Sequence, residues 1–284
     1  MSYLKKFSSV LLFVLLICIS CKNKKPYKSP AGYDINKPEK FVMKNSLKEI
    51  SGIAFIPGKE DVLYAIEDEA GKLFSITPGS DQLSHSKFGK KGDYEDVTIL
   101  NNTTVAVLKS NGSLYLFSTD EIGKERIDSV KEYEEILPEG EYEGLVADST
   151  KLIALCKHCP GDKEKKEVSV YILQQAPGDS LIVTNTFKVD ITLIQPKDEN
   201  GKEKFHPSGI AKNPVTHEWY IISSVNKLLL VLDEHWKAKD YYPLDPSVFK
   251  QPEGITFNSK GDLYISNEGG TGDANILLFR YQKQ

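Results

Sequence analysis

The sequence predicts an all-β fold, a five-bladed β-propeller built from four-stranded antiparallel blades. Three observations support this prediction. The chain repeats itself about every 45 residues, as propellers do. Short apolar runs alternate with Gly, Asn and Asp, which is typical of strands joined by turns. The 284 residues also include 14 Tyr and 12 Phe but only 2 Met, and aromatic side chains suit a pleated, half-buried surface.

Five stretches open the repeats, each with a polar residue or Gly ahead of alternating apolar residues. They are ISGIAF from Ile50, YEDVTIL from Tyr94, YEGLVAD from Tyr142, PSGIAK from Pro207 and PEGITF from Pro252. Aligned on Gly52, Asp96, Gly144, Gly209 and Gly254, they are spaced by 44, 48, 65 and 45 residues. Two further apolar runs follow each opening, so each repeat supplies three readable strands and a weaker fourth.

The ring has to close between the two ends of the chain. The fifth repeat stops just after its third strand, at 279–281, and an uncovered strand edge invites aggregation. Segment 40–44, with Phe41, Val42 and Met43, is predicted to supply the missing outer strand. The long third spacing includes QPKDENGKEK before His206 and is interpreted as an extended blade loop; a sixth, poorly marked blade is the alternative.

The N-terminal segment has the pattern of an export signal. Lys5 and Lys6 precede an apolar run, 10–19, that is shorter than the about 20 residues of a membrane-spanning helix. Ser20 and Cys21 resemble a bacterial lipobox, in which the Cys is lipidated, although Cys18 stands where Leu is usual; an ordinary signal peptide is the alternative. We therefore expect a signal peptide at 1–20, a lipid-anchored tether at 21–39 and a single propeller domain at 40–284, placed in the bacterial cell envelope at its periplasmic or outer-membrane face.

Charge excludes one class of partner. The 36 Lys and Arg against 40 Asp and Glu leave a net charge of −4, and no basic run beyond the N-terminus suggests a surface that follows phosphates. We expect no nucleic-acid partner and a monomeric protein.

Cys156 and Cys159 remain in the folded part. Pro160 follows them, which excludes c-type haem attachment, so a disulfide or two unpaired thiols is expected, with a redox-active pair as the alternative.

The blade openings also resemble a known family. ISGIAF, YEGLVAD and QPEGITFNSKGDLYISNE are similar to elements of the SdiA-regulated, YjiK-like family of exported bacterial proteins, which is distantly related to NHL-repeat propellers. The resemblance extends from about residue 45 to residue 284. It implies a five-bladed propeller with a bound calcium ion and no established biochemical activity.

The repeat register independently predicts a site. In a propeller the first strand of each blade lines the central channel, so the strand starts converge near the axis: Ser51, Glu95, Glu143, Ser208 and Glu253. The second strand returns to the same mouth and brings Glu67, Lys109, Lys157, Ser223 and Asn267. This ring carries a formal charge of −2, which one divalent cation would neutralise.

Oxygen ligands without His or Cys favour Ca²⁺, which accepts irregular coordination. The candidate metal ligands are Glu95, Glu143, Glu253, Ser51, Ser208, Glu67 and Asn267. The alternative is that Lys109 and Lys157 pair with Glu95 and Glu143 without any metal. His206 is a candidate general base or only a surface residue, and Trp219 and Trp236 are expected to pack between blades.

Three functions fit these observations. The preferred one is a membrane-anchored, calcium-binding propeller that binds a small ligand or an envelope protein over its channel, without catalysis. The alternative is a metal-dependent hydrolase of lactonase or phosphoesterase type, in which the ion polarises a carbonyl or phosphoryl oxygen. The third is a structural scaffold for an envelope assembly.

Overall fold

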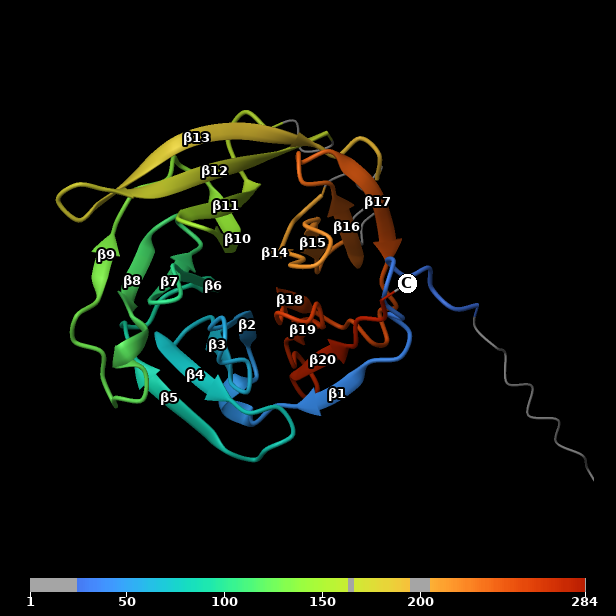
Figure 1. Ribbon diagram of the computed structural model, residues 1–284, viewed down its shortest axis with the longest axis horizontal. Helices are drawn as coiled ribbons and strands as arrows, with labels where there is room; N and C mark the ends of the chain where they lie inside the picture. Colours follow the sequence, from blue (N-terminus) through green and yellow to red (C-terminus); the bar gives the residue numbers. More distant parts are fainter. Residues whose placement is uncertain (1–24, 163–165, 195–204, 284) are drawn as a thin grey trace, which may run out of the picture.

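The computed structural model describes residues 25–162, 166–194 and 205–283. These residues form five four-stranded antiparallel sheets set radially around one axis (Figure 1). The predicted five-bladed propeller is confirmed, and the six-bladed alternative is wrong. The predicted signal peptide, Cys21 and the QPKDENGKEK segment lie outside the described residues.

Blades 1 to 4 run outward from the axis in sequence order, and blade 5 does so for its three inner strands. Blade 1 contains β2 (Ile50–Phe55), β3 (Leu63–Glu67), β4 (Lys72–Ile76) and β5 (Leu83–Lys87). Blade 2 contains β6 (Tyr94–Leu100), β7 (Thr104–Lys109), β8 (Leu114–Ser118) and β9 (Lys131–Tyr133). Blade 3 contains β10 (Glu141–Asp148), β11 (Lys151–His158), β12 (Glu167–Ala176) and β13 (Ser180–Asp190). Blade 4 contains β14 (Gly209–Lys212), β15 (Trp219–Ser223), β16 (Leu228–Leu232) and β17 (Ala238–Pro243). Blade 5 contains β18 (Pro252–Phe257), β19 (Leu263–Asn267), β20 (Asn275–Phe279) and, as its outer strand, β1 (Glu39–Val42).

Strand β1 closes the ring by joining the N-terminal part of the chain to the C-terminal part. It pairs antiparallel with β20, from Glu39 opposite Leu278 to Val42 opposite Asn275. The prediction that this segment supplies the missing strand is confirmed, with the strand beginning one residue earlier than expected. The outer edge of β20 in the last blade is therefore covered.

Residues ahead of β1 also pack onto the propeller, within the segment 21–39 predicted to be a tether. Tyr33 and Ile35 are buried in the cluster that joins blades 4 and 5. The Tyr33 hydroxyl donates to the Gly261 carbonyl at 2.6 Å and accepts from the Asn213 amide at 2.9 Å. The described chain is thus attached to the domain well before residue 40.

Glycine at the blade openings permits close packing between the inner strands. A Cβ on Gly52 of β2 would lie 2.3 Å from Asp96 Oδ1 of β6, and one on Gly209 would lie 2.5 Å from the Glu253 carbonyl oxygen. Only glycine fits where two backbones approach this closely. These glycines are explained by blade packing and need no ligand.

Side-chain hydrogen bonds link neighbouring blades near the same positions. The Ser51 hydroxyl donates to the Glu95 carbonyl, and the Ser208 hydroxyl donates to the Pro252 carbonyl at 2.8 Å. Asp96 accepts from the Leu145 amide at 2.7 Å, which links blades 2 and 3. Each bond spans a blade boundary, so the inner strands are held in a fixed relative position around the channel.

The long third spacing is partly explained by the outer hairpin of blade 3. Strands β12 and β13 have 10 and 11 residues, and Figure 1 shows them arching over the outside of the ring from β9 to β17. At the hairpin tip, the Asp179 carboxylate pairs with Lys131 at 2.8 Å, and its carbonyl accepts from Tyr133 at 2.7 Å. The hairpin therefore braces blade 2 from outside.

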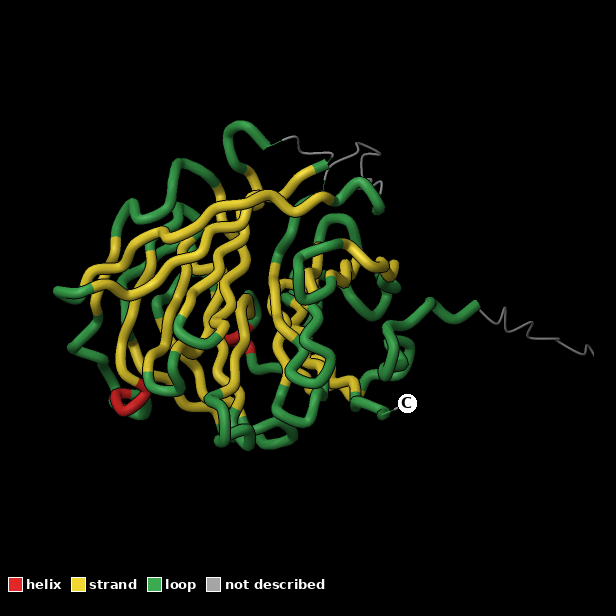
Figure 2. Tube along the Cα trace, turned by 45° about the horizontal axis from the view of Figure 1, so that its top comes forward, coloured by secondary structure: helices red, strands yellow, loops and turns green. Residues whose placement is uncertain are grey.

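The core consists of apolar layers between adjacent blades. Trp219, on β15, is buried in the layer between blades 3 and 4 and stacks on Trp236 with ring centroids 4.3 Å apart. Figure 2 shows strands and loops throughout, with helix only in the described 3₁₀ turns Asn45–Leu47 and Thr119–Glu121. None of the helices in the described part has the length and apolar character needed to cross a membrane.

Candidate functional site

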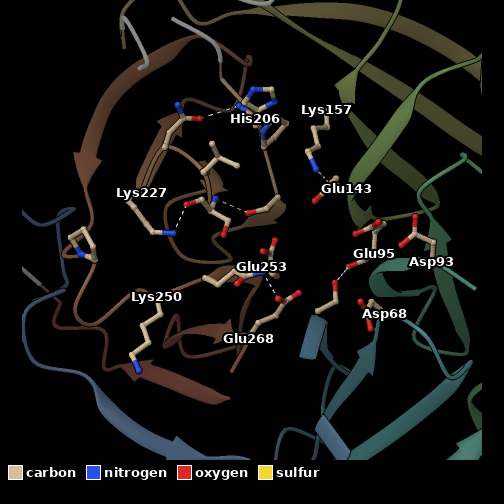
Figure 3. A pocket seen from close by; sticks show the side chains of 18 residues that line it. Asp68, Asp93, Glu95, Glu143, Lys157, His206, Lys227, Lys250, Glu253 and Glu268 are labelled. Atoms are coloured by element: carbon tan, nitrogen blue, oxygen red, sulfur yellow. Dashed lines mark hydrogen bonds and ion pairs between the residues drawn. The ribbon is translucent and has the colours of Figure 1, made fainter. Parts of the chain in front are cut away.

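A cavity of about 800 Å³ opens at one mouth of the central channel (Figure 3). Its walls come from the start of the first strand and the end of the second strand in the blades, together with nearby turns. The charged lining residues in the described part of the chain are Asp68, Asp93, Glu95, Glu143, Glu253 and Glu268, with Lys157, Lys227 and Lys250. Carboxylates thus outnumber lysines in this lining by six to three.

The structure brings together every first-strand residue that the repeat register placed at the channel. The cavity is lined by Ser51, Glu95, Glu143, Ser208 and Glu253. The two serines do not simply point into open space, because their hydroxyls donate to carbonyls of the next blade. The three glutamates are the members of this set that present charge to the cavity.

The second-strand residues behave differently. Of the predicted set, only Lys157 lines the cavity. Asn267 is fully buried and donates to Asn275 Oδ1 at 3.2 Å, while Glu67 accepts from the backbone amide of Ala70. Lys109 borders a separate depression, and Ser223 donates to Asn226 Oδ1 at 2.7 Å. Glu67 and Asn267 are therefore outside the cavity lining.

Strand register gives the physical reason. In blades 1, 2 and 5 the second-strand residue that was predicted to reach the channel does not pair with the first-strand residue that lines the cavity. It pairs with the residue just before it: Glu67 with Ile50, Lys109 with Tyr94, and Asn267 with Pro252. Directly opposed residues share a face of the sheet, and successive residues alternate between faces. In blades 1 and 5 the residue one place further along reaches the cavity, and these residues are the carboxylates Asp68 and Glu268. In blade 2 the corresponding residue, Ser110, lines the separate depression beside Lys109. Counting the alternation of side chains between the two faces from the bulge in the first strand would have identified both Asp68 and Glu268.

Burial and mutual repulsion raise the pKa values of several of the cavity acids. Burial, then the charges of Glu143 and Glu268, raises the pKa of Glu253 to about 8. Burial and neighbouring carboxylates likewise raise the pKa of Glu268 to about 7 and that of Asp68 to about 6. Burial is also the main cause of the raised pKa of Glu95. A cation placed among these groups would relieve this repulsion and displace their protons.

One carboxylate already has a protein partner. Lys157 forms an ion pair with Glu143, and its Nζ lies 3.1 Å from Glu141 Oε1. Burial acts to lower the pKa of Lys157, but the two carboxylates raise it by more, so the lysine is charged. The ion-pair alternative is thus confirmed for blade 3. Lys109 does not line this cavity, so Glu95 has no corresponding partner from its own second strand.

His206 lies where the sequence placed it, in the lining of the cavity. Its ring centroid is 4.6 Å from that of His158, and His158 Nδ1 lies 2.9 Å from Glu141 Oε2. A chain of charged and polar groups therefore runs from the mouth of the channel into the end of β11.

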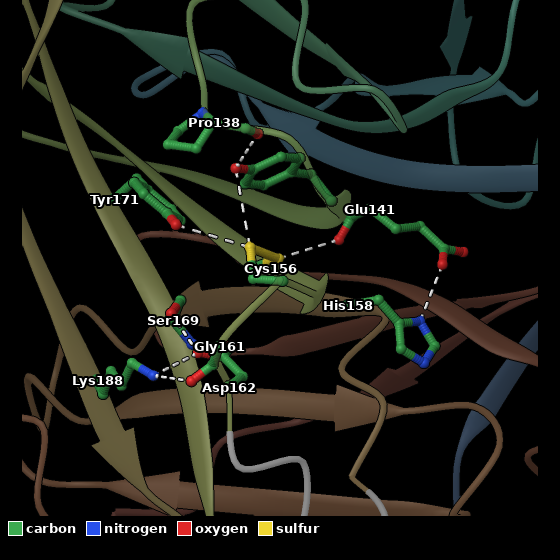
Figure 4. Close-up of a disulfide and its surroundings, with 11 residues drawn as sticks. Pro138, Glu141, Cys156, His158, Gly161, Asp162, Ser169, Tyr171 and Lys188 are labelled. Carbon is green, nitrogen blue, oxygen red and sulfur yellow. Dashed lines mark hydrogen bonds and ion pairs between the residues drawn. A yellow bond between two sulfur atoms is a disulfide. The ribbon is translucent and has the colours of Figure 1, made fainter.

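Cys156 and Cys159 form a disulfide at the end of β11 (Figure 4). The prediction of a disulfide is confirmed, and the alternative of two unpaired thiols is wrong. The bridge lies against Gly140, where a Cβ would be 2.9 Å from Cys159 Sγ. Lys157 lies within the small ring that the bridge closes, so the disulfide fixes the segment that delivers its ammonium group to Glu143.

Few oxygen ligands in the cavity lie close enough together to bind one metal ion directly. Among the described residues, Cys156, Cys159 and Asp162 are the one group of three His, Cys, Asp or Glu ligand atoms within 4.8 Å of one another, and its sulfurs are joined in the disulfide. At most two cavity carboxylates therefore contact one ion directly in this arrangement. Asp68 Oδ1 is buried and accepts no hydrogen bond within the described part. Oxygen ligands of this kind suit Ca²⁺, which also accepts water and backbone carbonyls.

Comparison with known proteins identifies the family. The family model described as SdiA-regulated matches residues 30–270. The chain belongs to the SdiA-regulated family. The resemblance found in the blade openings is thereby confirmed, and the matched range includes Tyr33 and Ile35 ahead of the first strand. No curated protein matches the chain.

Solved structures similar to this SdiA-regulated protein share the fold. The PQQ-bound aldose sugar dehydrogenase from Streptomyces coelicolor has a TM-score of 0.53 and 12% identity, covering 89% of this chain and 100% of that one. A luciferin-regenerating enzyme has a TM-score of 0.52 and 10% identity, covering 86% and 95%. A protein of unknown function from Bacteroides thetaiotaomicron has 0.51 and 11%, covering 90% and 76%. At these identities the likeness concerns the fold alone.

Proposed function

We propose that this SdiA-regulated propeller is a non-catalytic binding module that holds a cation, Ca²⁺ in the first instance, in the acid-lined mouth of its channel. The observation that supports the proposal is the gathering of six carboxylates around a cavity of about 800 Å³. Lys157 neutralises one of them, Glu143. Glu253, Glu268, Asp68 and Glu95 have raised pKa values because they are buried and lie close to other carboxylates.

Glu253, Glu268, Glu95 and Asp68 are the groups proposed to attract the ion, and at most two of them contact it directly in the present arrangement. This set keeps two of the glutamates chosen from the sequence and replaces Glu67 and Asn267 by their neighbours in the chain. Ser51 and Ser208 keep the inner strands in position through their bonds to the next blade. A bound Ca²⁺ supplies a positive charge and open coordination positions to which a ligand oxygen can bind.

A calcium titration followed by thermal melting tests this proposal. A ligand that binds only the native state increases the free energy of unfolding, by about 2.7 kcal/mol at a hundredfold excess over its Kd. The melting temperature rises as a result. We expect Ca²⁺ at millimolar concentration to raise the melting temperature of chelator-treated protein, and Mg²⁺ to raise it less. An unchanged melting temperature with Ca²⁺ would reject the calcium site.

The alternative function, a metal-dependent hydrolase, is favoured by one observation. His206 lines the same cavity as the acids and is a candidate base for activating water. A panel of lactone and phosphoester substrates, with and without Ca²⁺, separates the two functions. Rates at background for every substrate support the binding module, whereas a calcium-dependent rate that His206→Gln abolishes supports the hydrolase.

We also propose that Cys21 anchors the protein to a membrane of the cell envelope. Tyr27 packs against the core layer between blades 4 and 5. A chain spans at most about 3.5 Å per residue, so the six residues from Cys21 to Tyr27 would hold the propeller within about 20 Å of the lipid surface. Metabolic labelling with a fatty acid tests this: label on the native protein and none on Cys21→Ser supports the anchor, and equal labelling of both rejects it.

A further inference from the structure

A second cavity, of about 460 Å³, lies at the opposite mouth of the central channel. The innermost strands of the five blades, labelled β2, β6, β10, β14 and β18 in Figure 1, surround this channel. The acid-lined cavity lies around the starts of these strands, whereas the second cavity lies around their ends and the turns that follow. In the described part of the chain the two cavities share no lining residue. The second cavity is therefore a separate candidate site.

Aliphatic side chains from all five blades form the inner end of this second cavity. Each comes directly after the residue on which the repeats align, and together they are Ile53, Val97, Leu145, Ile210 and Ile255. All five are buried, with 1% to 3% of their surface exposed. The acids Glu95, Glu143 and Glu253 lie two residues earlier in the chain, on the other side of this aliphatic ring. The ring therefore separates an acidic mouth from an apolar one.

Nearer the opening of the second cavity, apolar side chains remain partly uncovered. Val146, Ala147 and Phe257 line the cavity and are only half-buried, although they belong to innermost strands. Apolar residues make up 14 of the 23 described lining residues, against three of 18 in the acid-lined cavity. A ligand that covers this apolar surface removes it from water, which is favourable. A lining of this kind is typical of a small-molecule site.

The carboxylates and the lysine in this lining already have partners. Lys212 Nζ lies 2.9 Å from Asp148 Oδ2 and 4.8 Å from the centroid of the Trp219 ring. Glu60 accepts from the Ser259 hydroxyl at 2.7 Å. A charged ligand would lose its hydration here and would have to compete for these partners, which is unfavourable. The lining therefore favours a neutral molecule.

Two threonines add hydrogen-bonding groups to the otherwise apolar wall. Thr98 and Thr256 occupy equivalent positions in blades 2 and 5, and both line the cavity. Thr98 Oγ1 accepts from the Ala147 amide at 2.9 Å. A hydroxyl that accepts a hydrogen bond keeps its own proton to donate. A ligand oxygen that accepts a hydrogen bond therefore fits this wall.

We infer that the second cavity binds a small neutral molecule that is mostly apolar and carries one hydrogen-bonding oxygen, as in an alcohol or a ketone. Its apolar part lies against the aliphatic ring and Phe257, and its oxygen accepts from Thr98 or Thr256. A volume of about 460 Å³ suits such a molecule. The inference is independent of the proposed cation site, because the acids belong to the other cavity.

Photoaffinity labelling of the full chain in detergent tests the inference. The probe is a trifluoromethyl-diazirine derivative of benzyl alcohol, and peptide mass spectrometry identifies the labelled positions. The assay is run at pH 8, where histidine side chains, such as that of the exposed lining residue His217, carry little charge. We expect labels within 53–57, 97–99, 145–148, 210–214 and 255–259, with chelator as well as with Ca²⁺.

Three eight-carbon competitors test the preference for a neutral ligand. 1-Octanol should suppress the labelling at a concentration about tenfold or more lower than octanoate or octylamine, a difference of about 1.4 kcal/mol. The charged head groups must be desolvated on entering the cavity, whereas the alcohol loses less. Concentrations are compared as those free in solution, outside the detergent micelles.

Thr256→Phe and Ala147→Phe each add an aromatic ring to the cavity, from two different blades. Both residues are half-buried, so the larger side chain can extend into the cavity, and the melting temperature checks that the fold is retained. We expect either variant to lose most of the labelling in the cavity. Thr186→Phe makes the same change on an exposed part of β13, outside the cavity, and should be labelled like the native protein.

The inference is overturned if the labels map to the acid-lined cavity, if octanoate or octylamine competes as well as 1-octanol, or if both phenylalanine variants of the cavity are labelled like the native protein. Labelling that falls as the protein concentration rises would mean that a second copy of the chain covers this mouth, and would also overturn it. A calcium-dependent rise in melting temperature without labelling of this cavity would retain the cation site and reject the apolar site. Labelling with the expected preference but without any calcium effect would do the reverse.

Discussion

Glu253→Gln removes the charge of a buried cavity acid whose pKa is strongly raised, while keeping the shape of its side chain. The structure raises the pKa of this carboxyl from 4.5 to about 8. The folded protein then binds more protons than the unfolded chain between pH 4.5 and pH 8, so this group lowers stability as pH rises through that window. At pH 7 the linked cost is about 3 kcal/mol, because each unit of pKa shift corresponds to about 1.4 kcal/mol.

In the absence of calcium, the variant should therefore be more stable than the native protein at pH 7 to 8 and similar to it near pH 4.5. A gain of about 3 kcal/mol corresponds to about 6 to 12 °C in melting temperature for a domain of this size. With millimolar Ca²⁺ the difference in stability between the variant and the native protein should become smaller or change sign, since the native carboxylate gains a partner and the amide does not.

Thermal melting at pH 4.5, 6, 7 and 8, with chelator and with Ca²⁺, measures both effects. Glu125→Gln is the matched control, because this exposed glutamate lies outside the cavity. A variant that is less stable than the native protein at every pH would refute the electrostatic reasoning. Equal stabilisation of the native protein and the variant by Ca²⁺ would refute a role for Glu253 in holding the ion.

Three further predictions concern the frame of the site. Lys157→Met should destabilise the protein by about 3 to 5 kcal/mol at pH 8, because Glu143 loses its partner; urea unfolding at pH 8 and pH 5 should show a smaller loss at pH 5, where the carboxyl protonates. The double variant Cys156→Ala, Cys159→Ala should lose about 2 kcal/mol, as expected for a very short closed loop, and reductant should lower the melting temperature of the native protein but not of the variant. Tyr33→Ala should cost about 3 kcal/mol in urea unfolding and expose the N-terminal segment to protease, since Tyr33 is buried against blades 4 and 5; unchanged protease sensitivity would contradict that packing.

The repeat pattern was sufficient to predict the propeller and the closing strand. Apolar runs at regular spacing determine which segments pair, and the register places Glu95, Glu143 and Glu253 at one mouth of the channel. The return strands were harder to place, because a bulge near the start of the first strand shifts the pairing in blades 1, 2 and 5. A shift of one residue moves a side chain to the opposite face of the sheet. For this reason the repeat register predicts Glu67 at the channel mouth, whereas Asp68 lines the cavity.

Other residues of the site could not be predicted from periodicity. Lys227 lies in a turn and Lys250 in a loop ahead of β18, where no period fixes the direction of a side chain. Tyr33 precedes the first strand in a stretch rich in Pro and polar residues, so its composition resembles a linker. Its burial depends on a surface made jointly by blades 4 and 5, which are distant in the sequence.

The residues that differ between blades, rather than those that repeat, indicate where this protein has a functional site. Glycines and short polar side chains at the blade openings serve the packing of inner strands, and a symmetric ring needs nothing more. The cavity acids oppose folding near neutral pH, because burial raises their pKa values, and Lys227 adds an unfavourable backbone conformation. Natural sequences commonly break local rules of this kind at functional sites. The acids of blades 1, 2 and 5 are then the part of the site that we propose attracts a cation, because a bound cation would offset the cost of burying them.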